Sequence, residues 1–137
     1  MAITRFKNWK NPKIRDGKPT KWNWIVKGVK NFKLGKNTDI GAFTYINALA
    51  GVEVQDGVQI GGGVKIYSVS TIDNKEGRVV LKKNCRIGAN SVIMPGVSVG
   101  EGSVVGALSF VNKNIPDNSV AVGCPVKIIC KVTENED

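Results

Sequence analysis

The side chains in this sequence that could carry acid–base or nucleophilic chemistry are few. The 137 residues include no histidine, and the three cysteines, Cys85, Cys124 and Cys130, have no C-x-x-C spacing. The lack of histidine excludes Ser-His-Asp and Cys-His catalysis, as well as zinc sites built on imidazole. An all-thiolate zinc site does not fit the cysteine spacing either, so the sequence predicts no metal.

Amides and carboxylates are the remaining candidates. Asn47 ends the stretch FTYIN, and its amide can both donate hydrogen bonds to a substrate and accept them from it, although a turn contact explains it equally well. Asp73 lies in a polar run and could serve as a general base if partial burial tuned its carboxyl group. Tyr67 and Asn74 flank the same run and are candidate substrate contacts, although Tyr67 could simply cover the fold.

The element that must position these side chains is a repeat with a period of six. Six is a multiple of the two-residue period of a strand, so each repeat keeps one side chain inward before a turn redirects the chain. Three repeats make one coil, and strands of successive coils then stack in parallel. Thirteen aliphatic residues follow the spacing, with two breaks: Leu34, Ile40, Ile46, Val54, Ile60, Ile66, Ile72, Leu81, Ile87, Ile93, Val99, Val105 and Val111.

One break in the repeat predicts a loop. The step from Ile72 to Leu81 is nine residues instead of six, so three extra residues should bulge out near residues 73–77. In a solenoid, inserted residues leave the core and form surface loops, which is where function concentrates.

The positive charge is confined to the N-terminal quarter. Residues 1–36 hold eleven Lys and Arg with one acid, Asp16, whereas the other residues hold nine Lys and Arg with ten acids. A basic segment with interleaved Trp9, Trp22 and Trp24 is compatible with a solvated lead-in that covers the core, which we favour. It is also compatible with steering of an anionic ligand, including a nucleotide base stacked on Trp22 and Trp24. Nucleic-acid binding is the least favoured interpretation.

The sequence favours a cytoplasmic protein. No run approaches the roughly 20 apolar residues of a membrane span. The N-terminus has no apolar segment typical of a signal peptide, and three cysteines without a disulfide framework favour a reducing compartment.

The motifs resemble one known family. Residues 86–97 (RIGANSVIMPGV), Val105-Gly106-Ala107 and the ending at residues 115–127 (IPDNSVAVGCPVK) are similar to the hexapeptide-repeat acyltransferases. The resemblance implies a left-handed parallel β-helix of about four to five coils. We expect a short basic N-terminal extension at residues 1–33, the β-helix domain at 34–131 and an acidic tail at 132–137.

The resemblance also implies a homotrimer that uses acetyl-CoA as co-substrate, bound in grooves between subunits. Small residues would line its pantetheine arm. Lys113 and Lys127 would meet the phosphates of its nucleotide end, and Pro125 would flank the adenine. The small residues at the matching positions are Gly88, Ala89, Ala107 and Ser109.

Val69 stands where many members of that family carry a histidine base. The leading hypothesis is N-acetylation of an amino sugar, which could be nucleotide-linked, because an amine attacks a thioester without a side-chain base. The alternatives are a carboxylate base such as Asp73, O-acetylation of a sugar, or an inactive scaffold trimer of the same fold.

Overall fold

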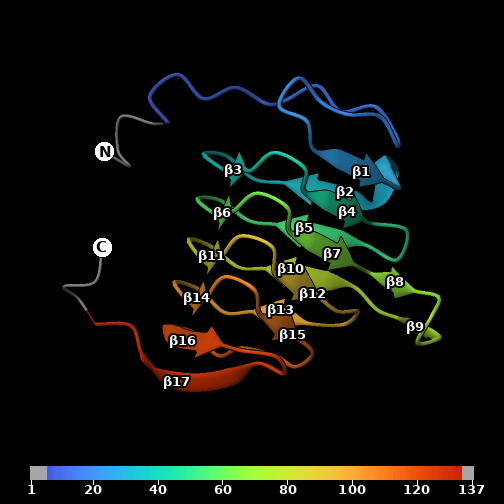
Figure 1. Cartoon of the computed structure of the whole chain (residues 1–137). Helices are drawn as coiled ribbons and strands as arrows, with labels where there is room; N and C mark the ends of the chain where they lie inside the picture. Colours follow the sequence, from blue (N-terminus) through green and yellow to red (C-terminus); the bar gives the residue numbers. More distant parts are fainter. Residues whose placement is uncertain (1–5, 134–137) are drawn as a thin grey trace.

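The computed structural model describes residues 6–133, which wind into a parallel β-solenoid of about five coils (Figure 1). The chain contains no α-helix in that range, and a single 3-10 turn, η1 (Val29–Asn31), links the first two strands. No helix in the described part is long and apolar enough to cross a membrane. The expected solenoid of hexapeptide repeats is confirmed.

Three sheets form the sides of the coil. Sheet A contains β1 (Ile25–Lys27), β4 (Tyr45–Asn47), β7 (Lys65–Tyr67), β12 (Val92–Ile93) and β15 (Phe110–Val111). Sheet B contains β2 (Phe32–Leu34), β5 (Val52–Val54), β10 (Val79–Leu81) and β13 (Ser98–Val99). Sheet C contains β3 (Asp39–Ile40), β6 (Gln59–Ile60), β11 (Arg86–Ile87), β14 (Val104–Val105), β16 (Ser119–Val122) and β17 (Lys127–Lys131).

The aliphatic repeat forms the core. Ile46 pairs with Ile66 in sheet A, and Ile40 pairs with Ile60 in sheet C, so equivalent residues of successive coils stack in register. Twelve of the thirteen predicted positions point inward. Ile72 is wrong, because it is 96% exposed. It lies six residues after Ile66, but the chain has already left the coil there to form a hairpin of β8 (Val69–Ser70) and β9 (Lys75–Glu76).

Two corners of the coil consist of stacked residues with positive φ. The turn from sheet C to sheet A has φ of about 60–70° at Asn23, Phe43, Gly63, Asn90 and Leu108. Asparagine adopts this conformation more readily than most residues, so glycine is not needed at every turn. Phe43 and Leu108 are large apolar residues, which rarely adopt positive φ, and both of their side chains are exposed.

The first coil begins at Ile25, inside the segment that the sequence assigned to a basic extension. β1 pairs with β4 in parallel, and Val26 stacks on Ile46. Residues 6–24 then cross the open end of the solenoid, at the top of Figure 1. Asp16 fixes this segment, because its Oδ1 accepts hydrogen bonds from the N–H groups of Gly28 and Val29 at 2.6 and 2.8 Å. Of the predicted acidic tail, residues 134–137 lie outside the described residues.

Candidate functional site

The residues predicted to contact a substrate meet at one end of sheet A. Asn47 is the last residue of β4 and pairs with Tyr67, the last residue of β7. Both are half-buried, and the ring of Tyr67 lies 6.0 Å from that of Tyr45. Asn47 Oδ1 accepts hydrogen bonds from the Leu49 N–H at 3.1 Å and from the Ser68 hydroxyl at 3.5 Å. Its amide nitrogen donates to no group within residues 6–133, so it is available to a ligand.

The inserted hairpin continues directly from this point. Val69 pairs with Glu76 across β8 and β9, and the Gly77 N–H donates to the Ser68 carbonyl at 2.9 Å to close the base of the hairpin. Asn47, Tyr67, Ser68 and Val69 therefore form one group, here called the Asn47 cluster. It presents amide, hydroxyl and alkyl groups.

The other two predicted residues of this region lie further out. Asp73 and Asn74 are exposed in the turn between β8 and β9, and the Ser70 hydroxyl donates to Asp73 Oδ2 at 2.8 Å. Asn74 occupies a turn position with φ of 52°. Within one chain, Asp73 is therefore not in the partly buried setting that the sequence-based hypothesis of a carboxylate base required.

A column of small residues occupies the exposed corner between sheets C and A. It consists of Ala42, Gly62, Ala89 and Ala107, one from each successive coil, and is here called the corner column. The carbonyls of Ala42, Gly62 and Ala89 accept hydrogen bonds from the next coil, whereas the four N–H groups donate to nothing within residues 6–133. An extended ligand with carbonyl groups could bind such a row of unpaired donors.

Gly88 contributes to this column through packing rather than by direct exposure. A Cβ on Gly88 would collide with the backbone N of Ala107 and lie 2.7 Å from its Cα. The glycine thus lets the turn of the next coil approach closely. Gly61 has the same relation to Ala89, whose N would be 2.7 Å from an added Cβ.

Ser109, also predicted to line the pantetheine site, points into the coil. Its side chain is 2% exposed. The hydroxyl donates to the Gly106 carbonyl at 2.7 Å and accepts from the Gly123 N–H at 3.1 Å. Small hydroxyl residues recur at this position because they satisfy the buried polar groups of the turn, as Ser91 also does by donating to the Gly106 carbonyl at 3.1 Å.

The predicted contacts to the nucleotide end of CoA gather at the C-terminal end of the solenoid. The closing segment packs along β15, because the Phe110 N–H donates to the Gly123 carbonyl and the Val126 N–H donates to the Phe110 carbonyl, both at 2.9 Å. Pro125 and Lys127 flank Val126, and Lys113 follows β15; all three are exposed. The structure therefore places Pro125 and Lys127 beside the strand that follows Ala107, whereas Lys113 lies beyond the far end of that strand.

Cys85 is unsuitable as a nucleophile. Its side chain is fully buried, and burial raises the pKa of the thiol to about 12, so it remains protonated. Cys124 and Cys130 are exposed.

Sequence reasoning found Ala89 and Ala107 but missed Ala42 and Gly62, which complete the column. A signal was available in the residue pair at each corner. The first residue of the pair is small, and the second is suited to positive φ, as in Gly62-Gly63 and Ala89-Asn90. The hydroxyl of Ser68, which contacts Asn47, was also missed because its position depends on where the hairpin leaves the coil.

Comparisons with known proteins agree with this geometry. The family described as bacterial transferase hexapeptide (six repeats) matches residues 78–113, and the hexapeptide repeat of succinyl-transferase matches residues 33–68. A putative acetyltransferase of Staphylococcus aureus is 45% identical over 62 residues, which is 45% of this chain and 31% of the relative. A galactoside O-acetyltransferase of Lactococcus lactis is 41% identical over 43% of this chain and 28% of its own length. The chain thus spans less than a third of the length of these curated relatives.

Solved structures with the same architecture include ligand complexes. A hexapeptide-repeat acetyltransferase of Vibrio cholerae in complex with acetyl coenzyme A has a TM-score of 0.76 and 26% identity, covering 81% of this chain and 66% of its own. The N-acyltransferase AntD of Bacillus cereus, in complex with dTDP and coenzyme A, has a TM-score of 0.70 and 29% identity over the same shares of the two chains.

Proposed function

The chain belongs to the hexapeptide-repeat acetyltransferase family, and from that premise we propose that it transfers an acetyl group from acetyl-CoA to the amine of an amino sugar. The observation that carries the choice of an amine is the chemistry of the Asn47 cluster. Val69 stands at the position of the expected base, and the chain has no histidine that could replace it. The sugar can be nucleotide-linked, since the net charge of +9 attracts a diphosphate.

The reaction does not require a basic side chain. The amine nitrogen attacks the thioester carbonyl carbon, and the C–S bond then breaks. The proton lost by nitrogen passes to the departing thiolate, so atoms and charges balance. The protein's contribution is to align the two substrates. The N–H groups of the corner column would hold the pantetheine arm, and the amide of Asn47 would orient the acceptor.

We further propose that the complete site forms between two copies in a homotrimer. The corner column lies at the start of each sheet A strand, and the Asn47 cluster lies at its end. The six residues from Gly62 to Tyr67 span at most roughly 16 Å, so one chain holds the two parts at opposite ends of a sheet A strand. A neighbouring copy can bring its column to this cluster. Exposed Phe43, Leu108 and Ile72 give apolar surface for such contacts.

Thiol release from acetyl-CoA tests the choice of acceptor. The native chain should turn over with glucosamine and not with glucose. Val69→His should gain transfer to glucose, whereas Val104→His, a matched change on sheet C, should not. Preferential turnover with glucose by the native chain would favour sugar O-acetylation, the activity for which the Lactococcus lactis relative is named. Silence with both acceptors would favour an inactive scaffold.

Subunit complementation tests the shared site. Asn47→Ala damages the cluster, and Ala107→Leu fills the column. If each site takes its column from one copy and its cluster from another, co-refolding equal amounts of the two inactive variants should restore about a quarter of the native activity, because random pairing leaves that share of sites intact. Sites within a single chain would regain nothing. Light scattering should give three times the 14.7 kDa chain mass.

A further inference from the structure

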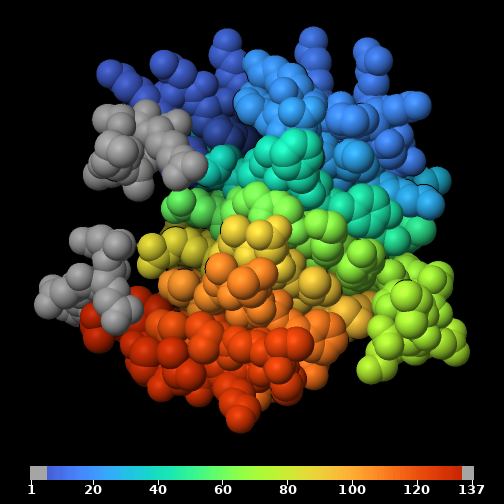
Figure 2. All heavy atoms as spheres, in the orientation of Figure 1, coloured from blue at the N-terminus to red at the C-terminus, as the bar shows by residue number. Residues whose placement is uncertain are grey.

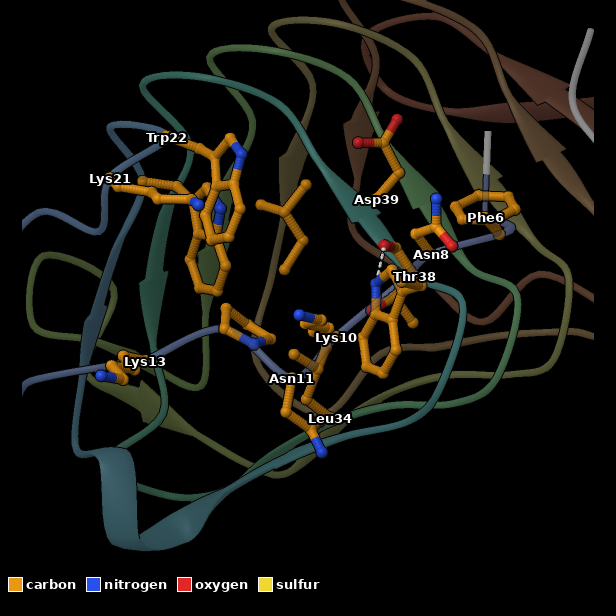
Figure 3. A pocket seen from close by; sticks show the side chains of 14 residues that line it. Phe6, Asn8, Lys10, Asn11, Lys13, Lys21, Trp22, Leu34, Thr38 and Asp39 are labelled. Carbon is orange, nitrogen blue, oxygen red and sulfur yellow. Dashed lines mark hydrogen bonds between the residues drawn. The ribbon is translucent and has the colours of Figure 1, made fainter. Parts of the chain in front are cut away.

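A cavity of about 610 Å³ lies at the N-terminal end of the solenoid, between the first coil and the segment that crosses it (Figure 3). It is here called the end cavity. Its volume is within the range of small-molecule sites. It is separate from the Asn47 cluster, none of whose residues lines it.

The walls of the end cavity are apolar and fixed. Trp24 and Ile40 are 3% and 8% exposed and form part of the buried core. Trp9 lines another side, and its indole N–H donates to the Thr38 carbonyl at 2.8 Å, which fixes the ring against the coil. The cavity therefore has rigid aromatic surfaces before any ligand binds.

The rim of the end cavity is cationic. Lys10, Lys13 and Lys21 line it, against a single acidic residue, Asp39. Within residues 6–133 none of the three ammonium groups forms an ion pair. Lys21 Nζ lies 4.6 Å from the centre of the Trp22 ring, and that ring is 47% exposed. The ammonium group of Lys21 thus covers one face of a ring that is about half exposed.

Trp22 also connects the end cavity to the corner column. The Phe43 N–H donates to the Asn23 carbonyl at 2.6 Å, so the Trp22-Asn23 turn continues the stack of corner turns by one step. Trp22 precedes the positive-φ residue Asn23 as Ala42 precedes Phe43, although here the carbonyl of Asn23, and not that of Trp22, accepts the hydrogen bond from the next coil. A ligand against Trp22 would lie at the N-terminal end of the column.

We propose that the end cavity binds a nucleoside diphosphate group, with its base against Trp22 and its phosphates among Lys10, Lys13 and Lys21. Aromatic rings bind nucleobases by stacking, and three unpaired cations match the charge of a diphosphate. A volume of about 610 Å³ suits a ligand the size of one nucleotide. The inference concerns binding alone and holds whether or not the acetyl acceptor is nucleotide-linked.

Tryptophan fluorescence reports this cavity selectively, because all three tryptophans of the chain line it. Titration with dTDP, without acetyl-CoA, should give a saturable change in emission. Thymidine and pyrophosphate, which each supply half of the ligand, should bind at least about tenfold more weakly, and added salt should weaken dTDP binding. Because the readout needs no acetyl transfer, its failure is distinguishable from failure of the proposed activity.

Paired charge variants localise the signal. Lys10→Gln/Lys13→Gln should lower dTDP affinity about tenfold or more. Lys18→Gln/Lys30→Gln removes the same charge from exposed positions of the N-terminal region outside the cavity and should leave affinity within about twofold. Trp22→Leu should weaken binding as well, and the lysine pairs keep the test valid if that variant does not fold.

Three results would overturn the proposal. One is the lack of any saturable response to dTDP. Another is an equal loss of affinity in the two lysine pairs, which would mean general attraction by charge. The third is tighter binding of a short single-stranded oligonucleotide than of dTDP, which would assign the basic end to nucleic acid.

Discussion

Gly88→Ala separates a packing role from a ligand-binding role at the corner column. An added Cβ would lie 2.7 Å from Ala107 Cα and from the Gly106 carbonyl carbon, and closer still to Ala107 N. All of these are backbone atoms. They cannot rotate away, because the Gly88 N–H is hydrogen-bonded to the Val105 carbonyl at 2.7 Å and fixes the two coils together. Relief of all three contacts to an ordinary distance of about 3.4 Å needs a shift of at least about 0.7 Å.

The magnitude follows from that shift. Overpacking against a fixed core costs about 1–3 kcal/mol, and the upper end applies because the neighbour is backbone. The reduced entropy of the unfolded chain offsets about 0.4–1 kcal/mol. We therefore expect a loss of about 2 kcal/mol in the free energy of unfolding, which for a chain of this length corresponds to about 6–8 °C in Tm.

Gly62→Ala is the matched control. It makes the same chemical change one coil away, at a position where Ala42, Ala89 and Ala107 already place a methyl group in neighbouring coils. Its added Cβ would lie 3.1 Å from the Ala42 carbonyl oxygen, a contact that small adjustments relieve. Its Tm should change by less than about 2 °C.

Differential scanning calorimetry at equal protein concentration, with and without CoA, measures both variants. A Gly88→Ala variant with native Tm and no CoA binding would refute the packing explanation and assign Gly88 to the ligand. Equal destabilisation by both substitutions would also refute it, because the two contacts would then be equivalent.

Three further outcomes are expected. Ala107→Leu, at an exposed position of the column, should weaken CoA binding at least about a hundredfold by calorimetric titration while changing stability by less than about 1 kcal/mol. A thiol reagent should label Cys124 and Cys130 rapidly in the native protein, and Cys85 only after unfolding, because its thiol is buried and its pKa is raised to about 12. Hydrogen bonds from the N–H groups of Val29 and Gly28 lower the pKa of the Asp16 carboxyl group in the folded protein. The ionised carboxylate should therefore stabilise the fold above its unfolded pKa of about 3.9, and this stabilisation should be lost as the pH falls through the lowered pKa of the folded state. Acid titration should then change tryptophan emission in the native protein and much less in Asp16→Asn.

The core could be predicted because each coil imposes the same constraint on it. Every inward position must be filled by an aliphatic side chain that stacks on its equivalent, so Ile60, Ile87 and Val105 stack in register although the hairpin lengthens the chain between the first two. The same constraint identifies the first coil, although its positive charge made this segment resemble a solvated extension in the sequence. Val26, Ile46 and Ile66 are spaced by 20 residues, but Lys27 and Lys33 between them suggested a solvated lead-in. Those lysines alternate with the buried residues and point outward.

The candidate site was less accessible to sequence reasoning, for two physical reasons. A small residue at a corner can lie exposed on the surface, as Ala107 does, or point into the turn, as Ser109 does, and the sequence pattern is the same for both. The hairpin also breaks the register on which the prediction relied. Ile72 matched the spacing by arithmetic alone, although no neighbouring coil supplied a partner for it.

The position of the hairpin shows how the solenoid can vary its chemistry at low cost. The chain leaves sheet A after Tyr67 and rejoins sheet B at Val79, which pairs with Val52 as though nothing had been inserted. Because the hydrogen bonds on both sides are preserved, the insertion costs only the entropy of closing a longer loop, which grows slowly with length. The fold therefore tolerates new side chains next to Asn47 without loss of its core. Val69 lies in the inserted hairpin and not in the buried core, so the Val69→His variant should report on chemistry more than on stability.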